Sequence, residues 1–92
     1  LEEMDVERIY LERLRSGSYR DFTKLYESYA SRLYAFALHL THSDALAKDI
    51  VQDIFFKLFE SSSSLPDDFL LKSWFYRVAR NAAVDYLRHL QV

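Results

Sequence analysis

The sequence contains no cysteine, and only one glycine and one proline stand among its 92 residues. Without thiols there is no disulfide scaffold, no thiolate zinc site and no cysteine nucleophile. A small sheet-rich domain needs turn residues about every eight to twelve positions, and this chain does not have them. We therefore expect an all-α domain in which few, short connections join the helices.

Long apolar runs are also missing. No stretch approaches the roughly 18 apolar residues that make up a membrane-spanning helix, and the acidic start lacks the pattern of a signal peptide. We therefore expect a cytoplasmic chain without membrane insertion. Hydrophobic residues make up 50% and charged residues 28% of the chain, which is ordinary for a folded globular protein. The length leaves room for one domain with a modest core.

Apolar spacing predicts four helices, separated by polar breaks. The repeats cover residues 4–15, 19–40, 45–60 and 70–90. Ser43 or Asp44 can cap the third helix, and residues 61–68, which are rich in serine and hold the proline, form the clearest loop. The expected architecture is a compact bundle of three to four helices, with residues 1–18 as a short helix and connector and residues 19–92 as the main domain.

Most of the fifteen aromatic residues are expected to fill the core, because they fall on the apolar stripes of the predicted helices. The expected core aromatics are Phe22, Tyr26, Tyr29, Phe36 and Phe55.

No constellation of residues supports an enzyme. His39, His42 and Asp44 could suggest a metal site, but two histidines three positions apart lack a third placed ligand and lie at a helix end that favours polar residues anyway. Asp67 and Asp68 lie in a loop without the apolar surroundings that raise a carboxyl pKa. A single glycine cannot build a phosphate-binding loop. We expect no catalytic residue, no metal and no cofactor.

Charge is unevenly distributed, although the net charge is only −2. Residues 49–71 hold five acidic side chains against one lysine, whereas residues 72–92 hold four basic side chains against one aspartate. An acidic segment is thus followed directly by a basic one, and the two suit different partners.

The third predicted helix has one polar face. At about 100° per residue, Asp49, Gln52 and Asp53 lie together, opposite Ile50 and Ile54. This pattern alone favours a plain solvated face. The alternative is a docking surface for a partner helix with a basic edge.

The last predicted helix carries an arginine face. Arg77, Arg80 and Arg88 lie on one side with Asn81 among them, and Trp74 lies at its border. The opposite side is the expected core side, formed by Leu71, Phe75, Val78, Ala82 and Tyr86. Arginine forks bind phosphates, asparagine hydrogen-bonds a base edge and aromatic rings stack on bases. The face therefore suits single-stranded nucleic acid, although a solvated basic face fits the pattern equally well.

Several segments occur together in a recognisable order. The letters FTKLYESY stand at residues 22–29, DIVQDIF at 49–55, WFYRVARN at 74–81 and DYLR at 85–88. This combination resembles region 2 of bacterial sigma factors, and among them the extracytoplasmic-function type. The resemblance covers roughly residues 19–90.

The resemblance implies a non-enzymatic subunit that gives core RNA polymerase its choice of promoter. In this family, the third helix binds the coiled coil of the clamp in the largest polymerase subunit. The implied polar contacts are Asp49, Gln52 and Asp53, with Phe55 and Leu58 mainly supporting the core. Members of the family are often held inactive by an anti-sigma protein, which joins the expected partners.

The resemblance also implies binding of promoter DNA. The loop at residues 61–70 would capture a flipped base of the non-template strand at the minus-ten element, and the last helix would contact the same element. The implied contacts are Arg77, Arg80 and Asn81, with Lys72, Trp74 and Arg88 as weaker candidates.

Some features depart from the family pattern. Lys48 stands where the family often has glutamate, and residues 61–68 hold no basic side chain. The family's second domain, a helix-turn-helix, is absent from these 92 residues, so we expect a fragment of a longer protein. Two rival functions are a helical interaction module that keeps this fold without binding DNA, and a small helical hydrolase.

Overall fold

The structure is a computed structural model that describes residues 3–17, 19–66 and 68–90. The described residues form helices α1 (Glu3–Arg15), α2 (Tyr19–Thr41), α3 (Asp44–Ser61) and α4 (Leu71–Leu90), with a short 3-10 helix η1 (Ser62–Ser64) after α3. They contain no strand. The prediction of an all-α bundle is therefore confirmed, and each predicted helix boundary lies within one residue of the observed one.

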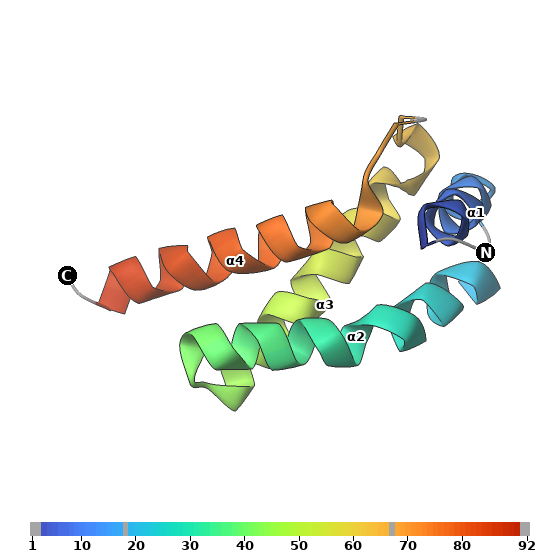
Figure 1. Cartoon of the computed structure of the whole chain (residues 1–92). Coiled ribbons are helices and arrows are strands. Elements are labelled where there is room, and N and C mark those ends of the chain that lie inside the picture. Colours follow the sequence, from blue (N-terminus) through green and yellow to red (C-terminus); the bar gives the residue numbers. More distant parts are fainter. Residues whose placement is uncertain (1–2, 18, 67, 91–92) are drawn as a thin grey trace.

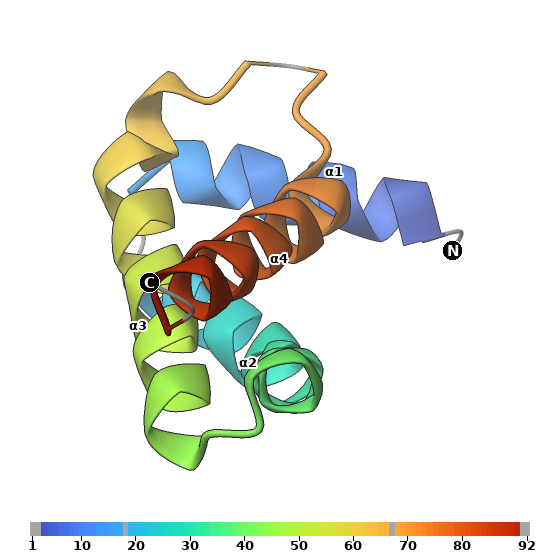
Figure 2. The same ribbon diagram turned by 90° about the vertical axis from the view of Figure 1, so that its left-hand side faces the viewer.

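The helices α2, α3 and α4 form the body of the domain. Figure 1 shows α2 and α4 along the length of the molecule, with α3 running diagonally from the end of α2 toward the start of α4. Helix α1 contacts α2, η1 and α4, and in Figure 2 the segment between α3 and α4 passes over it.

Local chemistry explains the turn between α2 and α3. His42 has a φ of 53°, which ends α2, and the Thr41 hydroxyl donates to the carbonyl of Ala37 at 2.9 Å. The backbone N–H of Leu46 then donates to the Ser43 hydroxyl oxygen at 3.3 Å. Of the two predicted caps, Ser43 is therefore the N-cap residue of α3.

The core is centred on Phe75 of α4, which is fully buried. Its ring centroid lies 5.0 Å from that of Tyr29 on α2 and 5.2 Å from that of Phe55 on α3. Other side chains without exposed surface surround these rings: Leu25, Leu33, Ile54, Leu58 and Leu71. Because burial of such side chains contributes about 1.5–3 kcal/mol each, this cluster holds the three long helices together.

The aromatic prediction was partly wrong. Tyr29 and Phe55 are buried, and Phe22 and Phe36 are half-buried against the core, but Tyr26 is 43% exposed. The buried side of α2 follows a four-residue spacing that includes Leu25, and Tyr26 lies about 100° further round the helix. Its ring therefore lies at the edge of the contact with α3 and not inside the core.

The core side of α4 also differs from the prediction. The buried residues are Leu71, Phe75, Ala79 and Ala83. Val78, Ala82 and Tyr86, which were expected in the core, are half-buried. The two fully buried alanines carry small side chains, which allow α4 to lie close to its neighbours along a strict four-residue spacing. The side of α4 that contacts the other helices is therefore rotated by about one residue from the side that carries the most apolar residues.

A polar cluster joins the end of α2 to the start of α3. The Tyr34 hydroxyl donates to Asp44, and Lys48 lies 3.0 Å from the other carboxylate oxygen of Asp44. The hydrogen bond from Tyr34, followed by that from Lys48, holds the pKa of Asp44 below its ordinary value of 3.8. The same bond to Asp44 raises the pKa of Tyr34.

Removing the central ring should destabilise the whole domain. We expect Phe75→Ala to lower the free energy of unfolding by about 3–5 kcal/mol, because it leaves a cavity between three helices. Urea denaturation measures the change. Leu90→Ala, at an exposed end of α4, is the control and should cost less than about 0.5 kcal/mol. Equal losses in the two variants would contradict this account of the core.

The Tyr34–Asp44 bond should be visible in an acid titration. The folded pKa of Asp44 lies below its ordinary value, so its contribution to stability is present at neutral pH and is lost as the pH falls through the folded pKa. We expect Tyr34→Phe to move the Asp44 midpoint upward toward 3.8, as measured by carboxyl carbon NMR. Tyr76→Phe should leave it unchanged, and an unmoved midpoint in Tyr34→Phe would refute the assignment.

Candidate nucleic-acid and protein interfaces

The polar face predicted on α3 lies on the surface. Asp49, Gln52 and Asp53 are exposed, whereas Ile50 and Ile54 on the other side of the helix are buried. The structure brings the three polar residues together around one shallow depression, which Phe56 also lines. This side of α3 is available to a partner because its opposite side is used by the core.

Asp53 already has a partner within α3. Its carboxylate lies 3.0 Å from the ammonium group of Lys57, and both side chains are about half exposed. An exposed pair at this spacing contributes only about 0.3–0.5 kcal/mol. A cationic group of a binding partner could therefore replace Lys57 at small cost.

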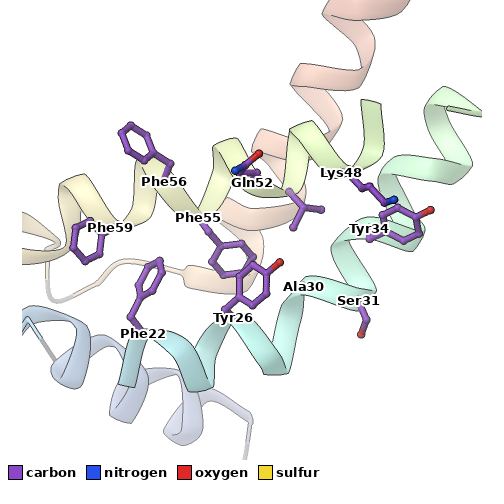
Figure 3. A pocket seen from close by; sticks show the side chains of 11 residues that line it. Phe22, Tyr26, Ala30, Ser31, Tyr34, Lys48, Gln52, Phe55, Phe56 and Phe59 are labelled. Carbon is purple, nitrogen blue, oxygen red and sulfur yellow. The ribbon is translucent and has the colours of Figure 1, made fainter. Parts of the chain in front are cut away.

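An apolar groove of about 830 Å³ runs between α2 and α3. Figure 3 shows Phe22, Tyr26 and Phe55 pointing toward one another across it. The ring centroids of Tyr26 and Phe55 lie 4.8 Å apart. Phe56 and Phe59, which also line the groove, are 61% and 51% exposed, and apolar rings with so much exposed surface are typical of an interaction site.

The sequence did not reveal this groove as a candidate site. Tyr26 had been expected in the core, and neither Phe56 nor Phe59 had been proposed as a contact residue. A signal was present, because Phe56 and Phe59 follow Gln52 by four and seven positions and so lie on the same side of the helix. Gln52 itself lines both the groove and the adjoining depression.

The predicted basic face of α4 is exposed as well. Arg77, Arg80 and Asn81 lie within about one turn of each other, and all three side chains are exposed. Arg88 is exposed too, but it lies about 16 Å further along the axis than Arg77, at 1.5 Å per residue. The first three residues therefore form one compact surface, which Arg88 extends toward the end of the helix.

The loop before α4 lies next to the first turns of this surface. Trp74 is half-buried, and its ring centroid lies 5.8 Å from that of Phe69 in the loop and 5.7 Å from that of Phe75 in the core. It occupies the predicted border position between the core and the polar face. Lys72, also half-buried, lies in the same first turns of α4.

The loop is structured where it leaves α3. Residues 62–64 form η1, and the hydroxyls of Ser62 and Ser64 donate to the carbonyls of Phe59 and Ser61 at 2.9 and 3.1 Å. Leu65 follows with its side chain in the core. The backbone N–H of Phe69 donates to the carbonyl of Pro66 at 3.2 Å.

Other kinds of site were sought in the described part of the chain. Within it, no three histidine, aspartate or glutamate side chains gather closely enough to hold a metal ion. His39 and His42 are both exposed. None of the described helices combines the length and apolarity that crossing a membrane requires.

Comparisons with known proteins agree with the fold. The family model for sigma-70 region 2 matches residues 25–91. The extracytoplasmic-function (ECF) RNA polymerase sigma factor SigM of Bacillus subtilis (strain 168) is 35% identical over 65 residues, which cover 71% of this chain and 39% of SigM. The RNA polymerase sigma factor CarQ of Myxococcus xanthus is 32% identical over 79 residues, which cover 86% of this chain and 45% of CarQ.

The chain thus spans less than half the length of these two relatives. A similar solved structure is the NMR structure of the complex between an engineered region 2 of sigmaE and GTAAAA. It has a TM-score of 0.75 and 25% identity, and the match covers 97% of this chain and 93% of that one. The division of this chain at residue 18 stays a prediction. From its fold, its motifs and these matches, the chain belongs to the sigma-70 region 2 family, as a domain of the extracytoplasmic-function type.

Proposed function

We propose that this chain is the sigma factor domain that binds core RNA polymerase through α3 and the single-stranded minus-ten element of a promoter through α4 and the preceding loop. The observation that carries the proposal is the exposed surface of Arg77, Arg80 and Asn81 beside an aromatic-bearing loop, in a fold shared with a sigmaE domain bound to GTAAAA. The role is binding rather than catalysis, and its place is the cytoplasm, where the polymerase acts.

The chemistry of α4 and the loop supports strand binding. Exposed Arg77 and Arg80 provide planar groups that bind phosphates in pairs of hydrogen bonds, and the amide of Asn81 can both donate to and accept from a base edge. Flipping a base out of its stack costs a few kcal/mol. The phosphate contacts, together with contacts between the base and the rings of Trp74 and Phe69, would offset that cost.

The surface of α3 supports docking to the polymerase. Asp49, Gln52 and Asp53 adjoin the exposed rings of Phe56 and Phe59, which gives an apolar centre with a polar border, as protein interfaces usually have. A groove between two helices suits a partner helix. The proposed occupant is the clamp coiled coil of the largest polymerase subunit, with cationic groups facing the aspartates.

A second candidate is an interaction module that keeps the fold without binding DNA, and the apolar groove alone would fit it. Such a module has no need for two arginines and an asparagine exposed together beside the loop, so the promoter-binding function is favoured. An anti-sigma protein stays an expected partner of the domain.

The docking proposal predicts which polar residues matter. We expect Gln52→Ala and Asp53→Ala each to weaken association with core RNA polymerase by about five- to tenfold, because each leaves a polar group of the polymerase without its hydrogen-bond partner. Titration of labelled domain with polymerase measures the affinity. Glu60→Ala, which removes an exposed acid from the same helix outside the depression, is the control. Unchanged affinity in both variants would show that α3 is not part of the polymerase interface.

The strand-binding proposal predicts different effects for asparagine and arginine. Asn81→Ala should reduce the preference for a cognate over a scrambled strand by about 1–3 kcal/mol, whereas Arg77→Ala should weaken the binding of both strands alike.

The proposal also predicts a salt dependence. With about four cations near phosphates, the logarithm of affinity should fall with the logarithm of salt concentration at a slope near −3. Lys24→Ala, on α2, should leave the slope unchanged. An affinity of the unaltered chain that does not change with salt concentration would contradict the proposal.

A further inference from the structure

A hydrogen bond joins helix α1 to the loop before α4 across 50 positions of sequence. The guanidinium Nε of Arg15 donates to the backbone carbonyl of Leu65 at 2.8 Å, in a partly buried setting. Arg15 is the last residue of α1, and Leu65 directly follows η1. The bond thus ties the end of the first helix to the middle of the segment that connects α3 to α4.

Apolar packing supports the same contact. Leu11 and Leu14 of α1 are buried, and the side chain of Leu65 is buried in the same core cluster. Helix α1 contacts η1, and Figure 2 shows the connecting segment arching over α1. Helix α1 therefore packs against one side of this connecting segment.

The hydroxyl groups of the loop act over a shorter range. Ser62 and Ser64 each donate to a carbonyl three residues earlier, which shapes the local turns. Such bonds do not orient the segment relative to α4. The contact with α1 does so, because it starts from a helix that packs on the body of the domain.

We propose that α1 positions the loop for base capture and that Arg15 is its positioning residue. This inference rests on the proposed function, in which the loop receives a flipped base. A pocket that discriminates between bases must have its shape before the base arrives, since ordering it on binding costs affinity and selectivity. By holding Leu65, Arg15 would fix the position of residues 62–65 relative to the body of the domain. Helix α1 would then contribute to the choice of promoter without touching DNA.

Arg13 provides a matched control on the same helix. It lies 3.6 Å from Asp21 on α2, and its side chain is about half exposed. Arg13 thus pairs with α2, and Arg15 donates to the loop. Replacing each arginine by methionine keeps the length of the apolar stem and removes the cationic donor.

The test measures base preference at each position of a bound strand. The 92-residue chain and its variants are incubated with a pool of single-stranded DNA hexamers randomised at every position, and the bound hexamers are sequenced. We expect Arg15→Met to reduce the preference at one position from about tenfold, the usual effect of a mismatched base, to about twofold. The other positions and the salt slope should keep their values. Arg13→Met should keep the full profile, and Arg15→Lys, which retains a cationic donor group without the planar fork of arginine, should recover part of the lost preference.

The outcomes separate the two proposals. A chain that selects no hexamer refutes the proposed function itself. A chain that selects hexamers while Arg15→Met keeps the complete profile overturns the role of Arg15 and leaves the proposed function standing. A uniform loss at all positions, together with a lowered melting temperature, also overturns it, because that is the result of a merely structural contact. Arg15→Gln gives the same decision if Arg15→Met does not fold.

Discussion

The contact between the rings of Phe55 and Phe75, with centroids 5.2 Å apart, is the constraint on which the rest of the domain depends. It joins α3 to α4, and each of these helices carries one of the two proposed interfaces on its other side. A helix that buries one side must present the opposite side to solvent. The same packing that stabilises the core therefore sets the orientation of the acidic surface relative to the basic one.

The helices and their polar faces could be predicted from the sequence because both depend on local periodicity. Asp49, Gln52 and Asp53 fall on one side of a helix wherever that helix packs. The exposure of Arg77 and Asn81 follows from the same rule. Even the prediction of a cap at Ser43 or Asp44 needs only the neighbours in sequence, which supply the unpaired N–H groups.

Features that need two elements could not be predicted in this way. Tyr26 belongs to the apolar stripe predicted for its helix, and only the position of α3 determines that it borders a groove. The rotation of α4 toward Ala79 and Ala83 depends on how closely two backbones approach each other, which apolarity alone does not encode. The bond from Arg15 to Leu65 spans 50 positions, and no sequence motif pairs an arginine side chain with a backbone carbonyl at such a distance.

The exposed rings of Phe56 and Phe59 distinguish the two surfaces thermodynamically. Covering apolar rings lowers the heat capacity and gives an attraction that weakens on cooling, whereas the arginine surface acts through charge, which salt screens. Cold should therefore act mainly on the groove, and high ionic strength mainly on the basic face.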